Sequence, residues 1–323
     1  MKKFFSDSLL AIIILVVTIS GCRGGNSGGT PPASFSIAES LVPGATSFPT
    51  GISEPYTNCT TVNYPYYIAK YEVTYVLWKE VYDWAQSHGY TLNPGKRGGG
   101  WANSSPNTEV FFDSGHESDP VTYINWYDAI VWCNALTEYY NEKKDQNLEC
   151  VYKDSEGNLI KNSTDKTIIT YLKSMNDFNR SANGFRLPTS MEWELAARYK
   201  DGSTWTPGNY ASGAAGPCTD PDATGAAAWY EINSIISTNP YPVWSTQPVG
   251  QKPAHGNALN LYDMSGNVWE WCFDWYPEYE CSSRVVRGGY YASANGSLRI
   301  GSMSYSDPGG ATSGLGIRPV RTK

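Results

Sequence analysis

The sequence predicts an α+β fold with two main helices, a third short helix and a loop-rich second half. Two stretches, 77–85 and 125–136, carry apolar residues at helical spacing. Beyond residue 199 this periodicity is replaced by short aromatic stretches between Gly and Pro, which is typical of small strands joined by long loops. The 12 Trp and 24 Tyr residues provide a substantial core. We therefore expect one large domain over residues 41–323.

The first helix is predicted to follow a strand over residues 66–73. Thr74 can cap it, because its hydroxyl can accept a hydrogen bond from an unpaired N–H of the first turn. Gly89 is a fair stop signal. Asn125, with Asp128 three residues later, is predicted to cap the second helix.

The third helix begins with a capping box, Thr189-Ser190-Met191-Glu192. We interpret Glu192 as a capping residue, and Glu194 with Arg198 as an ion pair one helical turn apart. Under this interpretation none of the three is a catalytic group, and the helix is a buried part of the scaffold.

The N-terminus has the pattern of a secretory signal over residues 1–21. Lys2 and Lys3 precede an apolar run, 9–19, that is too short to span a membrane. The triplet Ile19-Ser20-Gly21 leads into Cys22, as in bacterial lipoprotein signals, so we predict lipidation of Cys22; an ordinary cleaved signal is the alternative. Residues 22–40 then form a Gly/Ser/Pro-rich tether. These features predict a bacterial membrane-anchored lipoprotein at the outer membrane and cell surface.

Composition argues against several partners and cofactors. The net charge is −7 and no basic run occurs, so we expect no nucleic acid. The three histidines are scattered and no CxxC motif occurs, so we expect no zinc. In an exported protein the six remaining cysteines permit disulfides, whose pairing the sequence leaves open. These cysteines are Cys59, Cys133, Cys150, Cys218, Cys272 and Cys281.

Four motifs occur in a fixed order along the chain. They are RLPTSMEWELAAR (186–198), LYDMSGNVWEW (261–271), RVVRGG (284–289) and LGIRPV (315–320). Together with YEVT (71–74), PV through WYDA (120–129) and QPVG (247–250), they resemble the formylglycine-generating enzyme family, a branch of the C-type lectin fold. The resemblance implies a core of two helices and a small twisted antiparallel sheet, elaborated by many long loops.

The resemblance also implies a structural calcium ion, because the segment that matches 261–271 wraps calcium in related enzymes. The ligands here would be the carboxylates of Asp263 and Glu270 and the carbonyl oxygens of Gly266 and Val268. Hard oxygen donors on a tight turn suit this ion. The alternative is that the two tryptophans of the segment belong to the core and that Glu270 pairs with an arginine.

The catalytic chemistry of the resembling enzymes is not expected here. Their oxidation of a substrate thiol needs a copper-binding thiolate pair beyond RGG, where this chain has Ser293 and Leu298. We therefore expect no copper. The His-rich iron site of the related sulfoxide synthase is missing from the sequence, as are the sugar-binding tripeptides of calcium-dependent lectins, so we expect neither iron chemistry nor ordinary lectin activity.

The C-terminal part, 284–320, is similar to the variable proteins of diversity-generating retroelements, in particular the lipid-anchored treponemal variable proteins. Residues 290–314 contain no Trp, Lys, Glu or Gln, the types that adenine mutagenesis of AAC codons cannot produce. They are rich in Tyr, Ser, Gly and Ala, as antibody paratopes are. An ordinary Gly/Ser loop has a similar composition, and Met303 is not a product of such codons.

The sequence therefore predicts a non-catalytic, surface-anchored protein that binds an unknown protein or surface ligand through 290–314 and is diversified by a retroelement. The alternatives are a formylglycine-generating-type oxidase with an unrecognised site, and a structural protein of the envelope. Leu298 and Arg299 are assigned to the scaffold. The predicted contact residues are Tyr290, Tyr291, Ala292, Ser293, Asn295, Gly296, Ile300, Ser302, Ser304, Tyr305, Ser306, Thr312 and Ser313.

Overall fold

The computed structural model describes residues 35–52, 58–104, 108–166, 172, 181–238, 241–252, 257–279 and 282–323. The chain divides into two compact units, and the second, Ile37–Lys323, contains the helices and strands described below. The predicted signal peptide and Cys22 lie outside the described residues. In the part of the chain that is described, no helix is long and apolar enough to cross a membrane.

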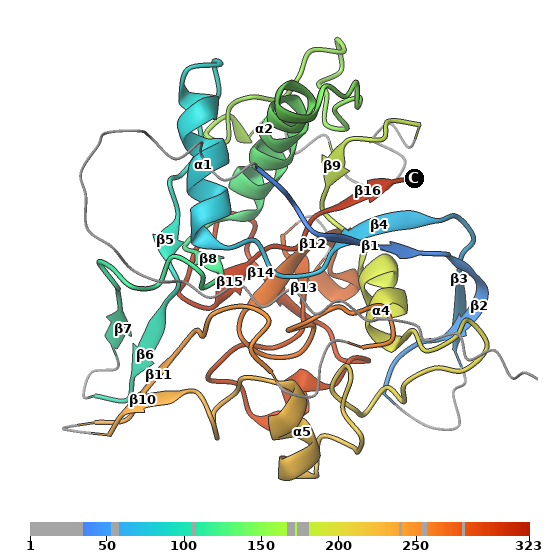
Figure 1. Cartoon of the computed structure of the whole chain (residues 1–323), viewed down its shortest axis with the longest axis vertical. Helices are drawn as coiled ribbons and strands as arrows, with labels where there is room; N and C mark the ends of the chain where they lie inside the picture. Colours follow the sequence, from blue (N-terminus) through green and yellow to red (C-terminus); the bar gives the residue numbers. More distant parts are fainter. Residues whose placement is uncertain are drawn as a thin grey trace, which may run out of the picture. The chain divides into compact units, whose positions relative to one another are not determined.

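Two helices pack side by side, α1 (Tyr75–Gln86) and α2 (Trp126–Lys144) (Figure 1). Each begins directly after its predicted capping residue, and α2 carries a complete capping box. The contact between them includes Trp78 and Trp132, which stack with ring centroids 5.0 Å apart. The helical periodicity therefore identified both helices, and their buried tryptophans form one side of the core.

Helix α4 (Ser190–Arg198) confirms the structural interpretation of its charged residues. Glu192 closes the capping box, and Glu194 accepts hydrogen bonds from Arg198 at 2.8 Å and from Arg287 at 2.8 Å. All four side chains are buried. Arg287 links the helix to the RVVRGG motif, so these charges hold two scaffold segments together.

Helix α5 (Pro221–Ala227) corrects the expectation that only strands and loops follow residue 199. Asp220 caps it by accepting hydrogen bonds from the backbone N–H groups of Asp222 and Ala223. Its seven residues, PDATGAA, have no apolar periodicity, so a search for helical spacing overlooks them. The Asp-Pro start was the available signal, because Pro suits the first helical turn.

The described strands form several small sheets, and their pairings are antiparallel except that of β12 with β15. The first sheet has the order β1 (Glu39–Val42), β4 (Tyr66–Ala69), β16 (Val320–Thr322), β9 (Phe185–Arg186). The second has the order β10 (Ile235–Ser237), β11 (Val243–Ser245), β6 (Gly100–Ala102), β7 (Thr108–Val110). The third has the order β14 (Ser304–Ser306), β13 (Arg284–Arg287), β12 (Trp269–Trp275), β15 (Leu315–Gly316). Two further pairs are β2 (Ala45–Pro49) with β3 (Cys59–Val62), and β5 (Lys96–Arg97) with β8 (Val121–Thr122).

The third sheet positions the C-terminal segment, because both ends of residues 290–314 lead to strands that pair with β12. Before the segment, Val286 of β13 pairs with Trp271. After it, Leu315 of β15 pairs with Trp269. In the middle, β14 returns to pair with β13. The segment therefore lies against this sheet along much of its length.

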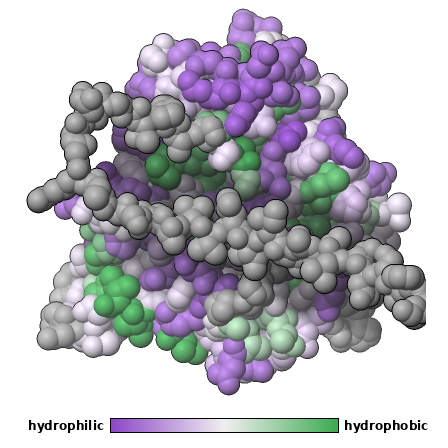
Figure 2. All heavy atoms as spheres, in the orientation of Figure 1, coloured by the Kyte–Doolittle hydropathy of each residue, from purple (hydrophilic) through white to green (hydrophobic). Residues whose placement is uncertain are grey.

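The face of the molecule seen in Figure 2 is hydrophilic over its upper part, where α1 and α2 lie in Figure 1. Hydrophobic residues form separate patches, one of them at the lower left, where β10 lies. Ile235 and Ile236 on this strand are 41% and 49% exposed. Strand β10 is an edge strand, and β11 separates it from β6.

Candidate functional site

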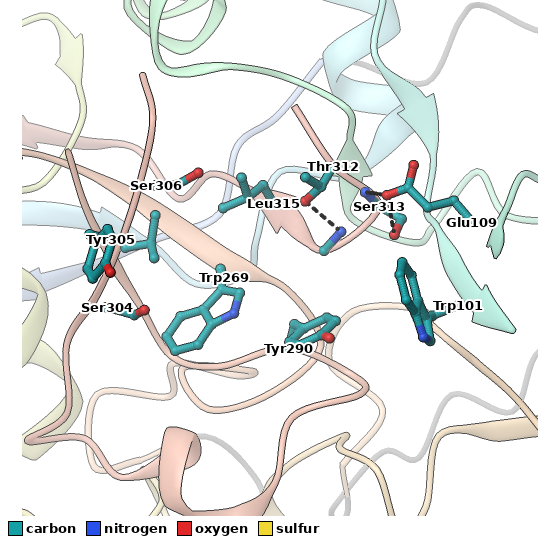
Figure 3. Close-up of a pocket in the computed structure, with 12 residues that line it drawn as sticks. Trp101, Glu109, Trp269, Tyr290, Ser304, Tyr305, Ser306, Thr312, Ser313 and Leu315 are labelled. Atoms are coloured by element: carbon teal, nitrogen blue, oxygen red, sulfur yellow. Dashed lines mark hydrogen bonds between the residues drawn. The ribbon is translucent and has the colours of Figure 1, made fainter. Parts of the chain in front are cut away.

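A groove lies where the C-terminal segment meets β6 and β7 (Figure 3). Its volume is about 290 Å³, and its aromatic lining comes from Trp101, Trp269, Tyr290 and Tyr305. In the view of Figure 3, Tyr290 lies between the two tryptophans and Tyr305 lies at the far end from Trp101. We call this feature the aromatic groove. Its polar lining consists of Glu109, Ser304, Ser306, Thr312 and Ser313.

A second hollow of about 210 Å³ adjoins the aromatic groove and shares Trp101 and Tyr290 with it. Its other walls are Asn103, Glu231, Trp244 and Ala292. Trp244 is held in place because its indole N–H donates to the backbone oxygen of Glu231 at 2.7 Å. The two shared rings thus form a wall between neighbouring hollows.

Most of the predicted contact residues lie at or near these hollows. Six line the aromatic groove, and Ala292 lines the second hollow. Asn295, Gly296 and Ser302 are half-buried and line neither hollow. The six in the groove are Tyr290, Ser304, Tyr305, Ser306, Thr312 and Ser313.

Four of the predicted contact residues are buried, and for Tyr291 and Ile300 the expectation of a surface role is wrong. Tyr291 and Ile300 are each 0% exposed. The Tyr291 hydroxyl donates to Ser313 Oγ at 2.9 Å, and Ile300 belongs to a buried hydrophobic cluster that includes Trp193. Ser293 and Ser313 are also buried, and Ser313 still lines the aromatic groove. The segment folds back over the third sheet, so part of it faces inward rather than forming a surface loop.

The groove includes residues that sequence reasoning missed. Trp101 and Glu109 come from β6 and β7, far from the C-terminal segment in sequence. Trp269 was placed in the core only under the alternative to calcium, and Trp244 and Glu231 were not assigned any role. The pairing of β6 with β11, Trp101 opposite Trp244, brings two of them together, and no local sequence pattern indicates that register.

The main chain of residues 290–314 is held by hydrogen bonds in which groups outside these residues donate to its carbonyl oxygens. These bonds come from side chains and from backbone N–H groups, and they occur along the whole of residues 290–314. They run from Ser234 Oγ to Tyr291 O (2.5 Å), Ser265 Oγ to Leu298 O (2.8 Å), Arg287 Nη1 to Ser302 O (2.6 Å), Trp126 N to Pro308 O (3.0 Å) and Tyr123 N to Thr312 O (3.0 Å).

The carboxylate of Glu270, a proposed calcium ligand, is already bound by protein donors. Arg318 donates to it from Nη2 at 2.7 Å and from Nε at 3.0 Å, and Trp193 Nε1 donates to its second oxygen at 2.6 Å. All three side chains are buried. This is the arginine pairing that the sequence left open as the alternative to calcium.

Asp263, the other proposed carboxylate ligand, has one oxygen bound and one without a partner. Its Oδ2 accepts from the backbone N–H of Gly250 at 2.6 Å, and its buried Oδ1 has no hydrogen-bond partner. Burial raises the pKa of this carboxyl to about 6. Because Glu270 is engaged, the four-ligand set with Gly266 and Val268 does not fit calcium in this arrangement. Calcium binding stays a prediction to be measured.

The described cysteines offer no thiolate to the groove. Five are free, and none lines either hollow; Cys281 lies outside the described residues. Ser293 and Leu298, at the places expected for the thiolate pair, are both buried. Burial raises the pKa of Cys272, on β12, well above its usual value. The groove therefore presents aromatic rings, hydroxyls and a carboxylate.

Residues 36–323 match the family model of the sulfatase-modifying factor enzyme 1-like domain. The chain belongs to this family. Chaperone protein LppX of Paenibacillus barcinonensis is 29% identical over 97% of this chain and 98% of its own length. The formylglycine-generating enzyme of Streptomyces coelicolor is 32% identical over 42% of this chain and 46% of its own length. Inactive C-alpha-formylglycine-generating enzyme 2 of Bos taurus is 30% identical over 42% of this chain and 43% of its own length.

Two solved structures of similar fold cover nearly the whole domain. CarF superposes with a TM-score of 0.64 and 27% identity over 89% of this chain and 99% of its own. Treponema denticola variable protein 1 superposes with a TM-score of 0.58 and 25% identity over 91% of this chain and 100% of its own. These matches confirm the predicted α+β fold and its resemblance to the formylglycine-generating enzyme family and to the variable proteins. By their names, members of the sulfatase-modifying factor enzyme 1-like family include enzymes and inactive relatives, so membership alone does not assign catalysis.

Proposed function

We propose that this protein binds a ligand in the aromatic groove and catalyses no reaction on it. The observation that carries the proposal is the lining of the groove, where ordered aromatic rings and hydroxyls gather beside a segment that has no thiol. Oxidation of a substrate thiol by copper needs a metal-binding thiolate pair, and no described cysteine lines this surface. Ligand binding requires only the aromatic rings and polar groups that line the groove.

The aromatic rings of the groove are held in place before any ligand binds. Tyr305 is 47% exposed, yet its ring packs against Tyr276 and Tyr279 with centroids 4.8 and 4.7 Å apart. Tyr290 packs edge-on against the buried Tyr291 at 5.0 Å. Ordered rings lose little conformational freedom on binding, which is why Tyr is a favoured contact residue in paratopes.

We further propose that the protein is anchored through a lipid on Cys22 and displayed at the cell surface, and that a retroelement diversifies its binding face. The likeness to Treponema denticola variable protein 1 supports this reading. A near-identical copy of the 3′ end of the coding sequence, next to a reverse transcriptase gene, is the expected genomic observation. A locus with neither feature would contradict the diversification.

The binding proposal is tested by ligand capture with matched variants. Tyr305→Ala should weaken capture from a cell-surface extract by roughly 30-fold, since a truncated aromatic anchor costs about 2 kcal/mol. Tyr241→Ala is the control, because Tyr241 is also 47% exposed but lines neither hollow. Equal loss in both variants, or no loss in Tyr305→Ala, contradicts the proposal.

The enzyme alternative makes its own prediction. A protein of the formylglycine-generating type should convert a cysteine-containing sulfatase peptide to the aldehyde in the presence of copper. We expect no conversion above the no-enzyme background when the product is measured by mass spectrometry. Copper-dependent conversion would overturn the non-catalytic reading.

A further inference from the structure

The two hollows share a chemical composition that points to the charge of the ligand. Each combines aromatic rings with one carboxylate: Glu109 in the aromatic groove and Glu231 in the second hollow. Among the residues that the structure describes, no Lys, Arg or His lines either one. Trp101 and Tyr290 line both hollows, and each hollow therefore combines these two rings with one carboxylate of its own.

Neither carboxylate is neutralised within the described part of the chain. No Lys, Arg or His nitrogen lies within ion-pairing distance of Glu109 or Glu231. Glu109 is oriented instead by Ser313, whose backbone N–H and hydroxyl both donate to its Oε1 at 3.2 Å. The fold thus positions this charge at the groove without compensating it.

The aromatic faces of the hollows are also free of internal cations. Elsewhere in the molecule, basic side chains cover ring faces: Lys252 lies 3.5 Å from the centre of the Trp229 ring and Arg284 lies 3.4 Å from that of Trp275. In the described residues no such contact involves Trp101, Trp244 or Tyr290. Ring faces attract cations through their quadrupole, and Trp attracts them most.

We propose that the aromatic groove and the second hollow are paired subsites for cationic side chains, and that the ligand is a peptide segment with two neighbouring Lys or Arg residues. The inference rests on the proposed binding function and names the chemistry of its ligand. The two cations would lie on opposite sides of the wall made by Trp101 and Tyr290, each facing one carboxylate.

The hydroxyl lining favours a peptide over a small polyamine. Ser304, Ser306 and Thr312 line the aromatic groove and can donate to or accept from backbone amides. A polyamine has no carbonyl oxygens to accept from these hydroxyls, whereas an extended peptide presents both donors and acceptors along its length. A peptide can therefore both donate to and accept from the hydroxyls of the lining, while a polyamine can only donate to them.

The test uses a fluorescently labelled peptide, Gly-Ser-Lys-Lys-Ser-Gly, with affinity measured by anisotropy at low and high salt. The same peptide with acetylated lysines controls for charge, and spermidine is measured as a competitor. We expect binding of the charged peptide, weakened by salt, and no binding of the acetylated one. Equal binding of the two peptides overturns the inference, and so does spermidine binding without peptide binding.

Charge-removing variants locate the subsites. Glu109→Gln and Glu231→Gln should each weaken the peptide about tenfold, because each removes one charge-assisted contact while the amide oxygen can still accept a hydrogen bond. Glu156→Gln is the matched control, since Glu156 is an exposed carboxylate that lines neither hollow. Melting temperature reports whether each variant is folded. Unchanged affinity in both folded groove variants overturns the assignment.

Failure of the cationic assignment can be told apart from failure of the proposed binding function. If capture from the cell-surface extract depends on Tyr305 but is indifferent to both Glu→Gln variants and to added dibasic peptide, the groove binds a ligand of another chemistry. The cationic assignment then fails and the proposed function stands. If capture is indifferent to Tyr305 as well, both fail.

Discussion

Replacing Glu270 by Gln should destabilise the protein strongly and independently of calcium. The substitution keeps the shape of the side chain but removes the negative charge that faces Arg318. That arginine is 0% exposed, so no water replaces the lost partner. Arg318 keeps two further acceptors, the backbone oxygens of Ala69 at 3.1 Å and Tyr262 at 2.8 Å. These satisfy N–H groups but do not neutralise the charge.

The expected loss is about 3 kcal/mol in the free energy of unfolding. Breaking one partner of a buried ion pair costs about 3–5 kcal/mol. The lower end applies here, because Glu72 and Asp263 also lie near Arg318 and supply part of the compensating field. Stability of a domain is typically about 5–15 kcal/mol, so the variant should still fold and unfold measurably.

Urea unfolding of wild type and variant, each with EDTA and with calcium chloride, measures this difference. The exposed pair Lys79–Asp83 provides the control, because Asp83→Asn should cost no more than about 0.5 kcal/mol. A loss below about 1 kcal/mol for Glu270→Gln would refute the ion-pair reasoning. A loss that disappears with EDTA, because the wild type itself loses stability, would instead establish the calcium site.

Three further predictions concern single residues. Tyr291→Phe should cost about 1 kcal/mol in urea unfolding, through the lost hydrogen bond to Ser313, and leave ligand capture unchanged; reduced capture without loss of stability would contradict its buried position. Asp263 has a pKa raised from 3.8 to about 6, so its contribution to stability is fully present below pH 3.8 and is lost as pH rises through 6. Asp263→Asn should therefore be more stable than wild type at pH 7, by up to about 3 kcal/mol, and equal to it near pH 4; destabilisation at pH 7 would point to a bound cation. Cys22→Ser should abolish palmitate labelling and release the protein from the detergent phase, and unchanged labelling would rule out lipidation at this residue.

The helices were predictable from sequence because their signals are local. Thr74, Asn125 and Thr189 each mark a helix start, and the structure places a helix after each one. Helix α5 was missed because it is too short for periodicity to appear. The family resemblance supplied the sheet, since most of the described strands have only two to four residues and carry little pattern of their own.

The candidate site was predictable only in part. The segment 290–314 was predicted to form a binding face, and part of it lines the groove, yet its composition does not reveal which residues face inward. Tyr290 and Tyr291 are neighbours of the same type, and one lines the groove while the other is buried. The opposite wall, with Trp101 and Glu109, depends on pairing between strands far apart in sequence, which local patterns do not specify.

The hydrogen bonds to the carbonyl oxygens of residues 290–314 have a consequence for how much of this segment can change. A main-chain carbonyl is the same whichever side chain its residue bears, so substitution of Ser302 or Thr312 leaves the bonds from Arg287 and Tyr123 in place. The backbone path of residues 290–314 therefore does not depend on which side chains its exposed residues carry. Each new set of side chains would inherit an already ordered backbone, and the entropy of ordering that backbone would be lost on folding rather than on binding.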